Sequence, residues 1–394
     1  MNITDRVNLI TSIGCEVIGN DSVNGISPLQ KLLENKPIVI AYDGFEPSGR
    51  MHIAQGLLRA HNVNKFVKAG VHFKFWVADW FALMNLKLGG DINKIQKAGK
   101  DMIKIWEACG MDTKAVDDNG NLMIEFIWSS DEINKRSDEY WRLVLDIATK
   151  FNLNRIKKCT TIMGKKEEDN VFDTIIGLNA EITQMFEENN IQELEKYKDS
   201  IMNKLKILLN TKLDELAASQ IFYPVMQCAD IFFLNVDICS LGLDQRKVNM
   251  LAIEYCDKIK RRFKPVIISH HMLQGLDGSD KMSKSNPDNT IFMDDSENEI
   301  KRKIKRAFCE PQNIEKNPLI DWIEHLILPI VGNISIATAH TDELESKSEV
   351  EINYTNIVEL KNNFLNGKIH PKGLKDAVTK SIIGLLIQVQ VKSK

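Results

Sequence analysis

The 394-residue chain is predicted to be an α/β protein: a Rossmann-like domain on a parallel sheet, with a helical insertion, followed by an all-α C-terminal domain. Two observations support this fold class. In the first part of the chain, short apolar and β-branched runs alternate with longer amphipathic segments, which is typical of a parallel sheet with crossover helices. Strand-like runs then disappear between about 131 and 220, and again after 294, so these two parts are predicted to be helical.

The elements follow from apolar periodicity, glycine and proline positions. Residues 1–34 are predicted to be an N-terminal helical segment. Strands are expected at 37–42, 72–80, 122–128, 222–237 and 264–269, and helices at 49–70, 92–110 and 244–262. The predicted domains are 35–270, with the insertion at about 131–220, and 271–394, with the boundary between the two bodies somewhere within 265–295.

Composition excludes several classes of protein. The net charge of −3 does not favour a nucleic-acid coat or a membrane-surface protein, so any polyanion site must be a local basic patch. The seven cysteines are scattered without a C-x-x-C pair, which argues against a zinc site or a disulfide framework and for a reducing compartment. No run has the length or apolarity of a membrane span or signal core. A cytoplasmic protein without a membrane partner is therefore expected.

The turn after the first predicted strand has the sequence YDGFEPSGRMHIAQG (42–56). Glycines between a strand and a helix let backbone N–H groups approach a phosphate, and the start of the helix favours an anion. His52 lies in the first turn of this helix. A lone histidine here is more often a surface residue than a catalyst, so His52 gains meaning only from a partner motif.

That partner is the loop DGSDKMSKSNPDN (277–289), which holds Lys281 and Lys284 among glycine, serine, asparagine and proline. A loop of this composition is usually a solvated turn. The alternative is a mobile clamp on phosphate. Because the loop follows the last strand of the sheet, it could meet the His52 turn over one ligand at the strand ends.

These two motifs resemble the signatures of the class I aminoacyl-tRNA synthetases. KMSKS at 281–285 matches letter for letter, while HIAQ at 52–55 departs from the HIGH-type signature at Ala54 and Gln55. Three further segments, GFEPSG (44–49), YPVMQCAD (223–230) and LGLDQRK (241–247), resemble tyrosyl-tRNA synthetases of the archaeal and eukaryotic type. The resemblance runs from about residue 36 to the end, with an extra helical stretch near 165–215.

The resemblance implies a set of site residues. The catalytic residues would be His52, Gln55, Lys281 and Lys284, with Gln55 replacing the second histidine as a neutral hydrogen-bond donor. Tyrosine would be held by Tyr42, Glu46, Tyr223, Gln227, Asp230 and Gln245. ATP would be held by Gly44, Gly242, Asp244, Met282 and Ser283. Taken singly, Asp230 could be a strand cap and Gln227 a satisfied core amide; their joint match to one pocket favours binding.

The implied activity is that of a tyrosine–tRNA ligase, which forms tyrosyl-adenylate and pyrophosphate from tyrosine and ATP and then charges tRNA(Tyr). Mg²⁺ is expected to arrive with ATP, because no carboxylate cluster suggests a protein-bound metal. A homodimer is expected, as in the family. Two alternatives remain open: the sister tryptophanyl enzyme, and a catalytically inactive RNA-binding relative.

Binding of tRNA needs local positive charge. The sequence offers Arg246 beside the pocket, Lys158 in NRIKKC, and the basic run at 301–306. Each has the alternative of a solvated helix face. His370 precedes Pro371 in a pair that contributes to anticodon recognition in relatives, but Gly373 stands where they carry an acidic residue. Asp79 is interpreted as structural.

Overall fold

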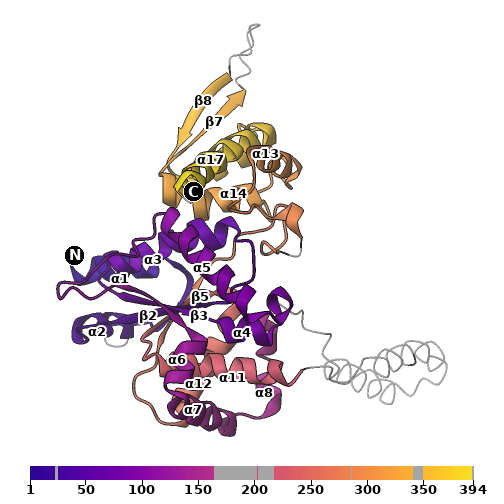
Figure 1. Ribbon diagram of the computed structural model, residues 1–394. Helices are drawn as coiled ribbons and strands as arrows, with labels where there is room; N and C mark the ends of the chain where they lie inside the picture. The colour runs from indigo at the N-terminus through magenta and orange to yellow at the C-terminus, as the bar shows by residue number, and fades with distance from the viewer. Residues whose placement is uncertain (23–24, 164–201, 203–216, 285, 340–348, 393–394) are drawn as a thin grey trace, which may run out of the picture.

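The computed structural model describes the whole chain except residues 23–24, 164–201, 203–216, 285, 340–348 and 393–394. The extra stretch expected near 165–215 therefore lies almost wholly outside the described residues. Figure 1 shows a sheet with helices on both faces and, above it, a smaller C-terminal part from which two strands project.

The larger sheet has six strands in the order β1-β6-β5-β2-β3-β4. Neighbouring strands are parallel except for β1, which pairs antiparallel with β6. The strands are β1 Gly14–Ile18, β2 Ile40–Phe45, β3 His72–Val77, β4 Ile124–Trp128, β5 Ile238–Gly242 and β6 Val266–His270. The predicted Rossmann-like parallel sheet is thus confirmed.

Helices connect and cover these strands (Figure 1). The α-helices of this part are α1 Ile3–Thr11, α2 Pro28–Asn35, α3 Arg59–Lys68, α4 Asp79–Met84, α5 Ile92–Ala108, α6 Ser129–Lys135, α7 Ser137–Lys150, α8 Leu153–Lys157, α11 Ala218–Phe233 and α12 Arg246–Lys258. A π-helical turn, η1 Ala54–Leu58, precedes α3. Every helix within the described ranges is too short or too polar to span a bilayer.

Two hydrophobic cores lie on opposite faces of the sheet. Adjacent residues of one strand contribute to different cores, because side chains alternate across a strand. In β2, Ala41 belongs to the core under α2, α3 and α5, whereas Tyr42 belongs to the core that contains α7, α11 and α12. In β6, Ile268 belongs to the first of these cores and Ile267 belongs to the second. Tyr42 therefore faces α11, which sets the position of the pocket described below.

Two element predictions in this part are wrong. The segment 1–34 is not wholly helical, because residues 14–18 form β1 at the edge of the sheet. The run 222–237 is not a strand: α11 covers most of it, and the strand β5 follows. α11 is buried on nearly every side, so it has no polar stripe that would reveal a helical period. Pro224 lies inside this helix, where it removes one backbone hydrogen bond, to the Gln220 carbonyl.

The C-terminal part is predominantly helical, as predicted. Its α-helices are α13 Glu297–Arg306, α14 Pro318–Trp322, α15 Leu328–Val331, α16 Ile357–Leu365 and α17 Pro371–Lys392, with a π-helical turn, η6 Ile323–Ile327. The all-α prediction is nevertheless wrong in one respect, because β7 Ile334–Ala339 and β8 Glu349–Tyr354 form an antiparallel pair. The core of this part is continuous with the core around α3 and α5.

Candidate active site

The strands β2 and β5 lie side by side although β3 and β4 separate them in the sequence. The strand order therefore reverses between β2 and β5, and ligands of open parallel sheets bind at such a point, beyond the carboxyl ends of the strands. β2 leads through Gly44 to Glu46 and Ser48, while β5 ends at Gly242, just before Asp244. The sequence motifs thus converge on the expected edge of the sheet.

A buried polar pocket, here called the phenol pocket, lies between β2, α7 and α11. Tyr42 and Asp230 are almost fully buried, and burial, followed by the charge of Asp230, raises the pKa of Tyr42 far above its usual value. Asp230 Oδ1 accepts a 2.9 Å hydrogen bond from the Tyr140 hydroxyl. Among the residues that the structure describes, Asp230 Oδ2 has no hydrogen-bond partner. An unpaired carboxyl oxygen in a buried pocket is costly, so this atom is ready to bind a polar group of a ligand.

The protonation of Asp230 follows from the same surroundings. Burial raises the pKa of Asp230 well above its usual value, and the hydrogen bond from Tyr140 and the nearby Trp76 indole offset this only in part.

The sequence analysis did not identify Tyr140 or Trp76. They lie on α7 and β3, outside every motif, and only the fold brings them to Asp230.

Glu46 is the centre of a second polar group. Its Oε1 accepts a 2.8 Å hydrogen bond from the Tyr223 hydroxyl and a 3.1 Å bond from Asn85 Nδ2. Lys87 Nζ lies 3.4 Å from Glu46 Oε2. Burial, followed by the charge of Glu46, raises the pKa of Tyr223 well above its usual value, so the phenol stays a donor. Asn85 and Lys87 follow α4 and were not identified from sequence either.

Two glutamines link α11 to the segment after β5. Gln227 Nε2 donates a 3.1 Å hydrogen bond to Gln245 Oε1, and Gln245 Nε2 donates to the Ile162 carbonyl at 3.0 Å. Gln227 Oε1 is buried and finds no partner within the described ranges of the chain. Gln227 is therefore not the satisfied core amide of the alternative interpretation, because one of its polar atoms is left open.

His52 stands at the start of η1. A π-helical turn is rare and often found at functional sites. His52 Nδ1 accepts a 3.3 Å hydrogen bond from the Gln55 N–H, so the ring hydrogen of the neutral imidazole lies on Nε2. Burial, with the positive charges of Lys284 and Arg59, lowers the pKa of His52 to about 3. His52 is thus a neutral donor near pH 7.

The neighbouring Gln55 has a buried side-chain oxygen, Oε1, which has no hydrogen-bond partner among the described residues.

The KMSKS loop closes over the strand ends through its two lysines. Lys281 Nζ donates to Asp244 Oδ2 at 2.7 Å, and Lys284 Nζ donates to Ser48 Oγ at 2.9 Å. One lysine thus contacts the segment after β5 and the other contacts the turn after β2. Burial, followed by the nearby charges of Lys87 and Arg59, lowers the pKa of Lys284 to about 8. A solvated turn would not show these features.

The backbone of the loop is fixed by contacts near its middle. The Met282 N–H donates to the Leu273 carbonyl at 3.0 Å, and the Ser283 N–H donates to Thr290 Oγ1 at 3.1 Å. Met282 is buried. Ser285, the last residue of the motif, lies outside the described residues. The structure therefore holds the middle of the loop while its lysines extend over the strand ends.

A buried ion pair that the sequence analysis missed lies beside His52. Arg59 Nε is 3.0 Å from Asp43 Oδ2, and in the described part of the chain both Arg59 Nη1 and Asp43 Oδ1 lack hydrogen-bond partners. Burial raises the pKa of Asp43 to about 6, against the opposing charge of Arg59. Burial and the charge of Arg59 also lower the pKa of His270 to about 4. Arg59 thus adds a fixed positive charge near His52 and Lys284.

Two other charged residues have structural roles. Asp79 accepts hydrogen bonds from the Ser129 and Ser130 hydroxyls at 2.7 and 2.6 Å, in agreement with its interpretation as structural. Lys303 belongs to the basic run at 301–306, but its side chain is 4% exposed and its Nζ lies 2.6 Å from Asp295 Oδ2. Lys303 is therefore not available to a tRNA phosphate, and its inclusion in the basic surface was wrong.

The remaining candidates for tRNA binding lie at the surface. Lys158 and His370 are exposed, while Arg246 Nε lies 2.7 Å from Glu16 Oε2 in a half-exposed ion pair. The missing acid at position 373 has a steric cause. A Cβ on Gly373 would lie 2.6 Å from the Ala337 carbonyl oxygen, so α17 packs against β7 too closely for any side chain.

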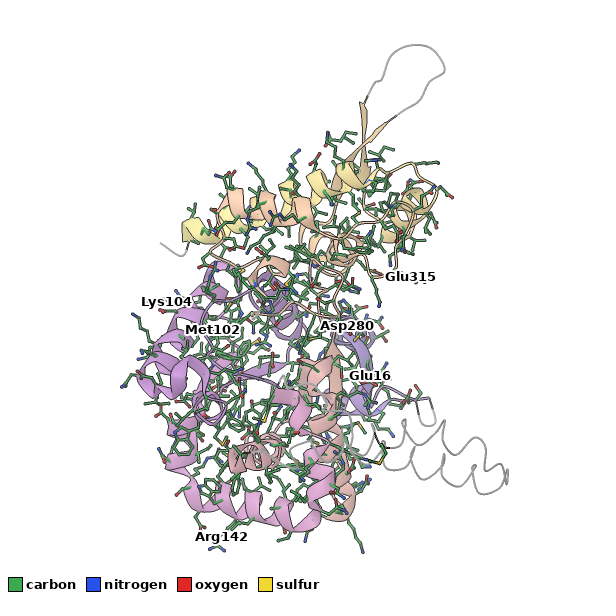
Figure 2. All side chains as sticks on the ribbon, turned by 90° about the vertical axis from the view of Figure 1, so that its right-hand side faces the viewer. Glu16, Met102, Lys104, Arg142, Asp280 and Glu315 are labelled. Carbon is green, nitrogen blue, oxygen red and sulfur yellow. The ribbon has the colours of Figure 1, made fainter. Side chains whose placement is uncertain are left out.

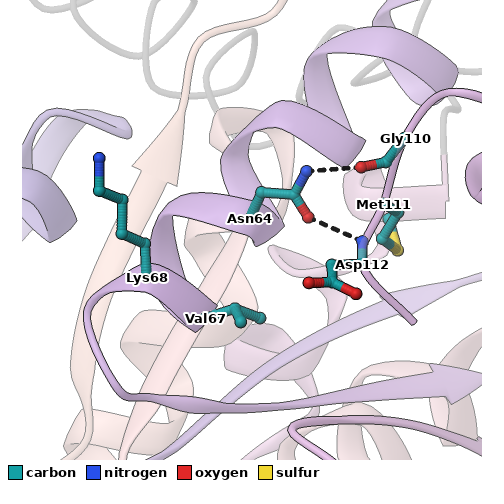
Figure 3. Close-up of a pocket in the computed structure, with 6 residues that line it drawn as sticks. All are labelled: Asn64, Val67, Lys68, Gly110, Met111 and Asp112. Carbon is teal, nitrogen blue, oxygen red and sulfur yellow. Dashed lines mark hydrogen bonds between the residues drawn. The ribbon is translucent and has the colours of Figure 1, made fainter. Parts of the chain in front are cut away.

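A surface hollow elsewhere does not belong to this site. Its volume is about 580 Å³, and it lies between the C-terminal end of α3 and the loop after α5, near the amino ends of the strands (Figure 3). Asn64 spans it, donating to the Gly110 carbonyl at 2.8 Å and accepting from the Asp112 N–H at 3.0 Å (Figure 3). These bonds tie the loop to α3, which is a structural role.

Known proteins resemble the chain over nearly its whole length. The family model for the class I tRNA synthetases (W and Y) matches residues 34–175 and 172–386. The cytoplasmic tyrosine–tRNA ligase 1 of Arabidopsis thaliana is 42% identical, over 96% of this chain and 83% of that protein. Ligase 2 of the same plant is 41% identical, over 98% of this chain but 43% of that protein.

Among solved structures, the tyrosyl-tRNA synthetase of Leishmania major in complex with tyrosinol gives a TM-score of 0.76 at 40% identity. The match covers 99% of this chain and 50% of that one. The chain thus spans about half the length of this protein and of plant ligase 2, and most of the length of plant ligase 1. With the matched motifs at the strand ends, these similarities show that the chain belongs to the class I tRNA synthetases, among the tyrosine–tRNA ligases.

Proposed function

We propose that this chain is itself a tyrosine–tRNA ligase, which activates tyrosine with ATP to tyrosyl-adenylate and pyrophosphate and then transfers the tyrosyl group to the terminal ribose of tRNA(Tyr). One observation carries this proposal: the KMSKS lysines contact Asp244 and Ser48, which follow the carboxyl ends of β5 and β2, and β2 also carries Tyr42 of the phenol pocket. This arrangement supports a cation clamp and a polar pocket that serve one ligand.

Tyrosine fits the phenol pocket through its hydroxyl. The substrate hydroxyl would bind the open Asp230 Oδ2, with the Tyr42 hydroxyl as its second neighbour. A phenol hydroxyl can donate to Asp230 and accept from Tyr42 at once, whereas an indole N–H can only donate, which favours the tyrosyl over the tryptophanyl alternative. The substrate ammonium would bind the acceptors around α11, where Gln227 Oε1 is open and Glu46 is already held in place by Tyr223.

The first reaction step needs no general base. The carboxylate of tyrosine is ionised near pH 7, so its attack on the α-phosphate depends on positioning and on stabilisation of phosphate charge. His52, neutral and with its hydrogen on Nε2, would donate to the α-phosphate side. Lys281 and Lys284 would stabilise the leaving pyrophosphate. Gly44 and Gly242 would leave room for ATP beside the strands.

Asp244 has two partners in this scheme. It now holds Lys281 in an ion pair of 2.7 Å, and the family resemblance implies that the same carboxylate would approach the ribose of ATP. Binding of the ribose hydroxyls would compete for Asp244 and release Lys281 towards the phosphates. The pair would thus keep the lysine near the site until ATP arrives.

Mg²⁺ would be carried by ATP. Near Lys284 the described residues offer the Ser48 hydroxyl and the carboxylate of Glu46, and that carboxylate is already bound by Tyr223 and Lys87. Such a set does not form the oxygen cage of a resident ion, but it leaves the phosphate oxygens free to hold Mg²⁺. The ion would neutralise phosphate charge when bound.

The wider arrangement is also part of the proposal. The domain boundary is placed near residue 271, with a helical anticodon-binding part beyond it, and Lys158, Arg246 and His370 are assigned to tRNA contact. A homodimer in the cytoplasm is proposed from the family resemblance and from the cytoplasmic names of the plant relatives.

The decisive experiment is ATP–pyrophosphate exchange with the purified chain, using tyrosine and tryptophan separately, followed by charging of tRNA(Tyr). We expect exchange with tyrosine only. Exchange with tryptophan alone would replace this proposal by the tryptophanyl alternative. A folded chain without exchange would support the inactive RNA-binding alternative.

A further inference from the structure

We propose that His271, Asp321 and His325 bind a divalent transition-metal ion of the zinc class, at the junction between the sheet and the C-terminal part. His271 follows β6 directly, Asp321 lies on α14, and His325 lies on η6. One ligand atom from each residue lies within 4.8 Å of the other two. The proposed reaction uses none of these side chains, so this inference does not depend on it.

The three side chains converge on one point. His271 Nε2 lies 2.6 Å from Asp321 Oδ1, and His325 Nε2 lies 3.9 Å from the same oxygen. The two imidazoles stack with their centroids 3.9 Å apart and an angle of 30° between the rings. Two histidines from different parts of the chain thus direct the same ring nitrogen at one carboxylate oxygen.

The chemistry of these donors favours zinc. Two imidazole nitrogens and a carboxylate oxygen form a three-ligand set that zinc accepts, with water in the fourth position, whereas Mg²⁺ and Ca²⁺ prefer oxygen ligands. Zinc bonds of about 2.0–2.2 Å in tetrahedral geometry separate neighbouring ligand atoms by roughly 3.3 Å. The distances of 2.6 and 3.9 Å lie on either side of this separation. Side-chain rotations that also part the two stacked rings would admit the ion.

The surroundings hold the carboxylate in position. Asp321 is 8% exposed, and its Oδ2 accepts a 2.9 Å hydrogen bond from the Gln274 N–H, which leaves Oδ1 for the ion. Such outer partners orient metal ligands. Glu324 Oε2 lies 3.8 Å from His325 Nε2 and is paired with Lys361, so the positive charge of that lysine is balanced beside the site.

An ion here would join two parts of the molecule. It would link the segment after β6 to α14 and η6, and the same segment continues through Gln274 to the KMSKS loop. Figure 2 shows Asp280, the neighbour of Lys281, where the two parts meet. The Trp322 indole already donates to the Gln274 carbonyl at 2.9 Å, so the ion would reinforce an existing contact. We therefore expect zinc to raise the thermal unfolding midpoint of the chain.

The test is a calorimetric titration of the full, chelator-treated chain with Zn²⁺, and a parallel titration with Co²⁺ followed by visible absorption. We expect one ion per chain and a higher unfolding midpoint with Zn²⁺. His325→Ala should weaken Zn²⁺ binding at least tenfold and abolish the rise in midpoint. His325 Nε2 lies beyond hydrogen-bond distance of its neighbours, so this variant should keep its fold, which circular dichroism will check.

The matched control is His370→Ala, which removes an exposed histidine from the same part of the chain and should leave Zn²⁺ affinity unchanged. Asp321→Asn should weaken binding as His325→Ala does. Three results would each overturn the proposal: no saturable binding of Zn²⁺, equal binding by wild type and His325→Ala, or a near-ultraviolet thiolate band with Co²⁺, which would place the ion on a cysteine.

Discussion

The phenol pocket is enclosed between β2, α7 and α11, whereas the KMSKS loop lies over the strand ends and is joined to them by two side-chain contacts. Tyr42, Tyr140 and Asp230 are each at most 1% exposed, while the Lys281 side chain is 41% exposed. Within the described residues, the pocket leaves Asp230 Oδ2 without a hydrogen-bond partner. The loop must exchange its present partners for phosphate. We infer that amino-acid selection is preorganised in this molecule and that catalysis depends on exchange of contacts.

The largest expected effect is on the loop side. Lys284→Ala removes a cation whose present partner is the neutral Ser48 hydroxyl, so little is lost when the lysine turns to phosphate. Loss of such a charge stabiliser should slow adenylate formation by roughly 100-fold or more. Lys281→Ala should cost less, about tenfold, because Lys281 must first leave the Asp244 carboxylate. Single-turnover adenylation measures both, with tyrosine affinity as the control that should not change.

If both lysine variants keep the full adenylation rate, the loop is a solvated turn after all, and the contrast with the pocket disappears. Equal losses in the two variants would instead show that the Asp244 pair has no energetic consequence for ATP binding.

A substitution in the phenol pocket should change the selectivity for tyrosine over phenylalanine and not only the rate. Asp230→Ala removes the open oxygen that we assign to the tyrosine hydroxyl, which would leave that hydroxyl unpaired at a cost of about 2–3 kcal/mol. The ratio of kcat/KM for tyrosine over phenylalanine should therefore fall by roughly 100-fold. Exchange kinetics with both amino acids measure this ratio.

Tyr140→Phe is the matched control, because the Tyr140 hydroxyl bonds Asp230 Oδ1 and not the open Oδ2. It should keep most of the selectivity. A larger loss of selectivity in Tyr140→Phe than in Asp230→Ala would mean that the phenol of the substrate binds elsewhere.

The pH dependence separates the two regions further. The pKa of Lys284 is lowered to about 8, so its ammonium is present below pH 8 and is lost above it. The value of kcat/KM for ATP reports the free enzyme, and it should fall as pH rises through about 8. Lys284→Arg keeps a permanent charge and should remove this fall in kcat/KM at alkaline pH. If the fall persists unchanged in Lys284→Arg, a group other than Lys284 causes it.

The sequence predicted those parts of this design that are local. β-branched runs and glycine-bearing turns identified β2, β3, β4 and β6, and the two signature motifs identified the strand-end residues. α11 was mistaken for a strand because it is buried all round, and β1 was missed because its five residues, Gly14–Ile18, pair only with a strand some 250 residues away. Long-range pairing leaves no local period to detect.

The residues missed in the site share one property. Each lies on an element outside the motifs and acts by contacting a motif residue that the fold brings near it. These residues are Tyr140, Asn85, Lys87 and Arg59. Composition could not show that Lys303 is buried, because Lys303 contacts its partner Asp295 only when α13 packs in the folded chain. Supporting contacts of this kind depend on tertiary structure and have no signature of their own.

Gln55 lies outside both regions, in η1 beside His52, and the effect of replacing it is expected to be of the same order as that of Lys281→Ala. Its N–H fixes the His52 ring, its carbonyl accepts a 2.6 Å hydrogen bond from the Trp106 indole, and its side-chain Oε1 is buried without a partner. Only the side chain changes in Gln55→Ala, so the backbone that orients His52 stays. Adenylate formation should slow at least tenfold, about 1.4 kcal/mol, if the amide donates to ATP. Near-wild-type adenylation with unchanged ATP affinity would show that only the backbone of Gln55 serves the site. The position of the second histidine in this signature would then have lost its role.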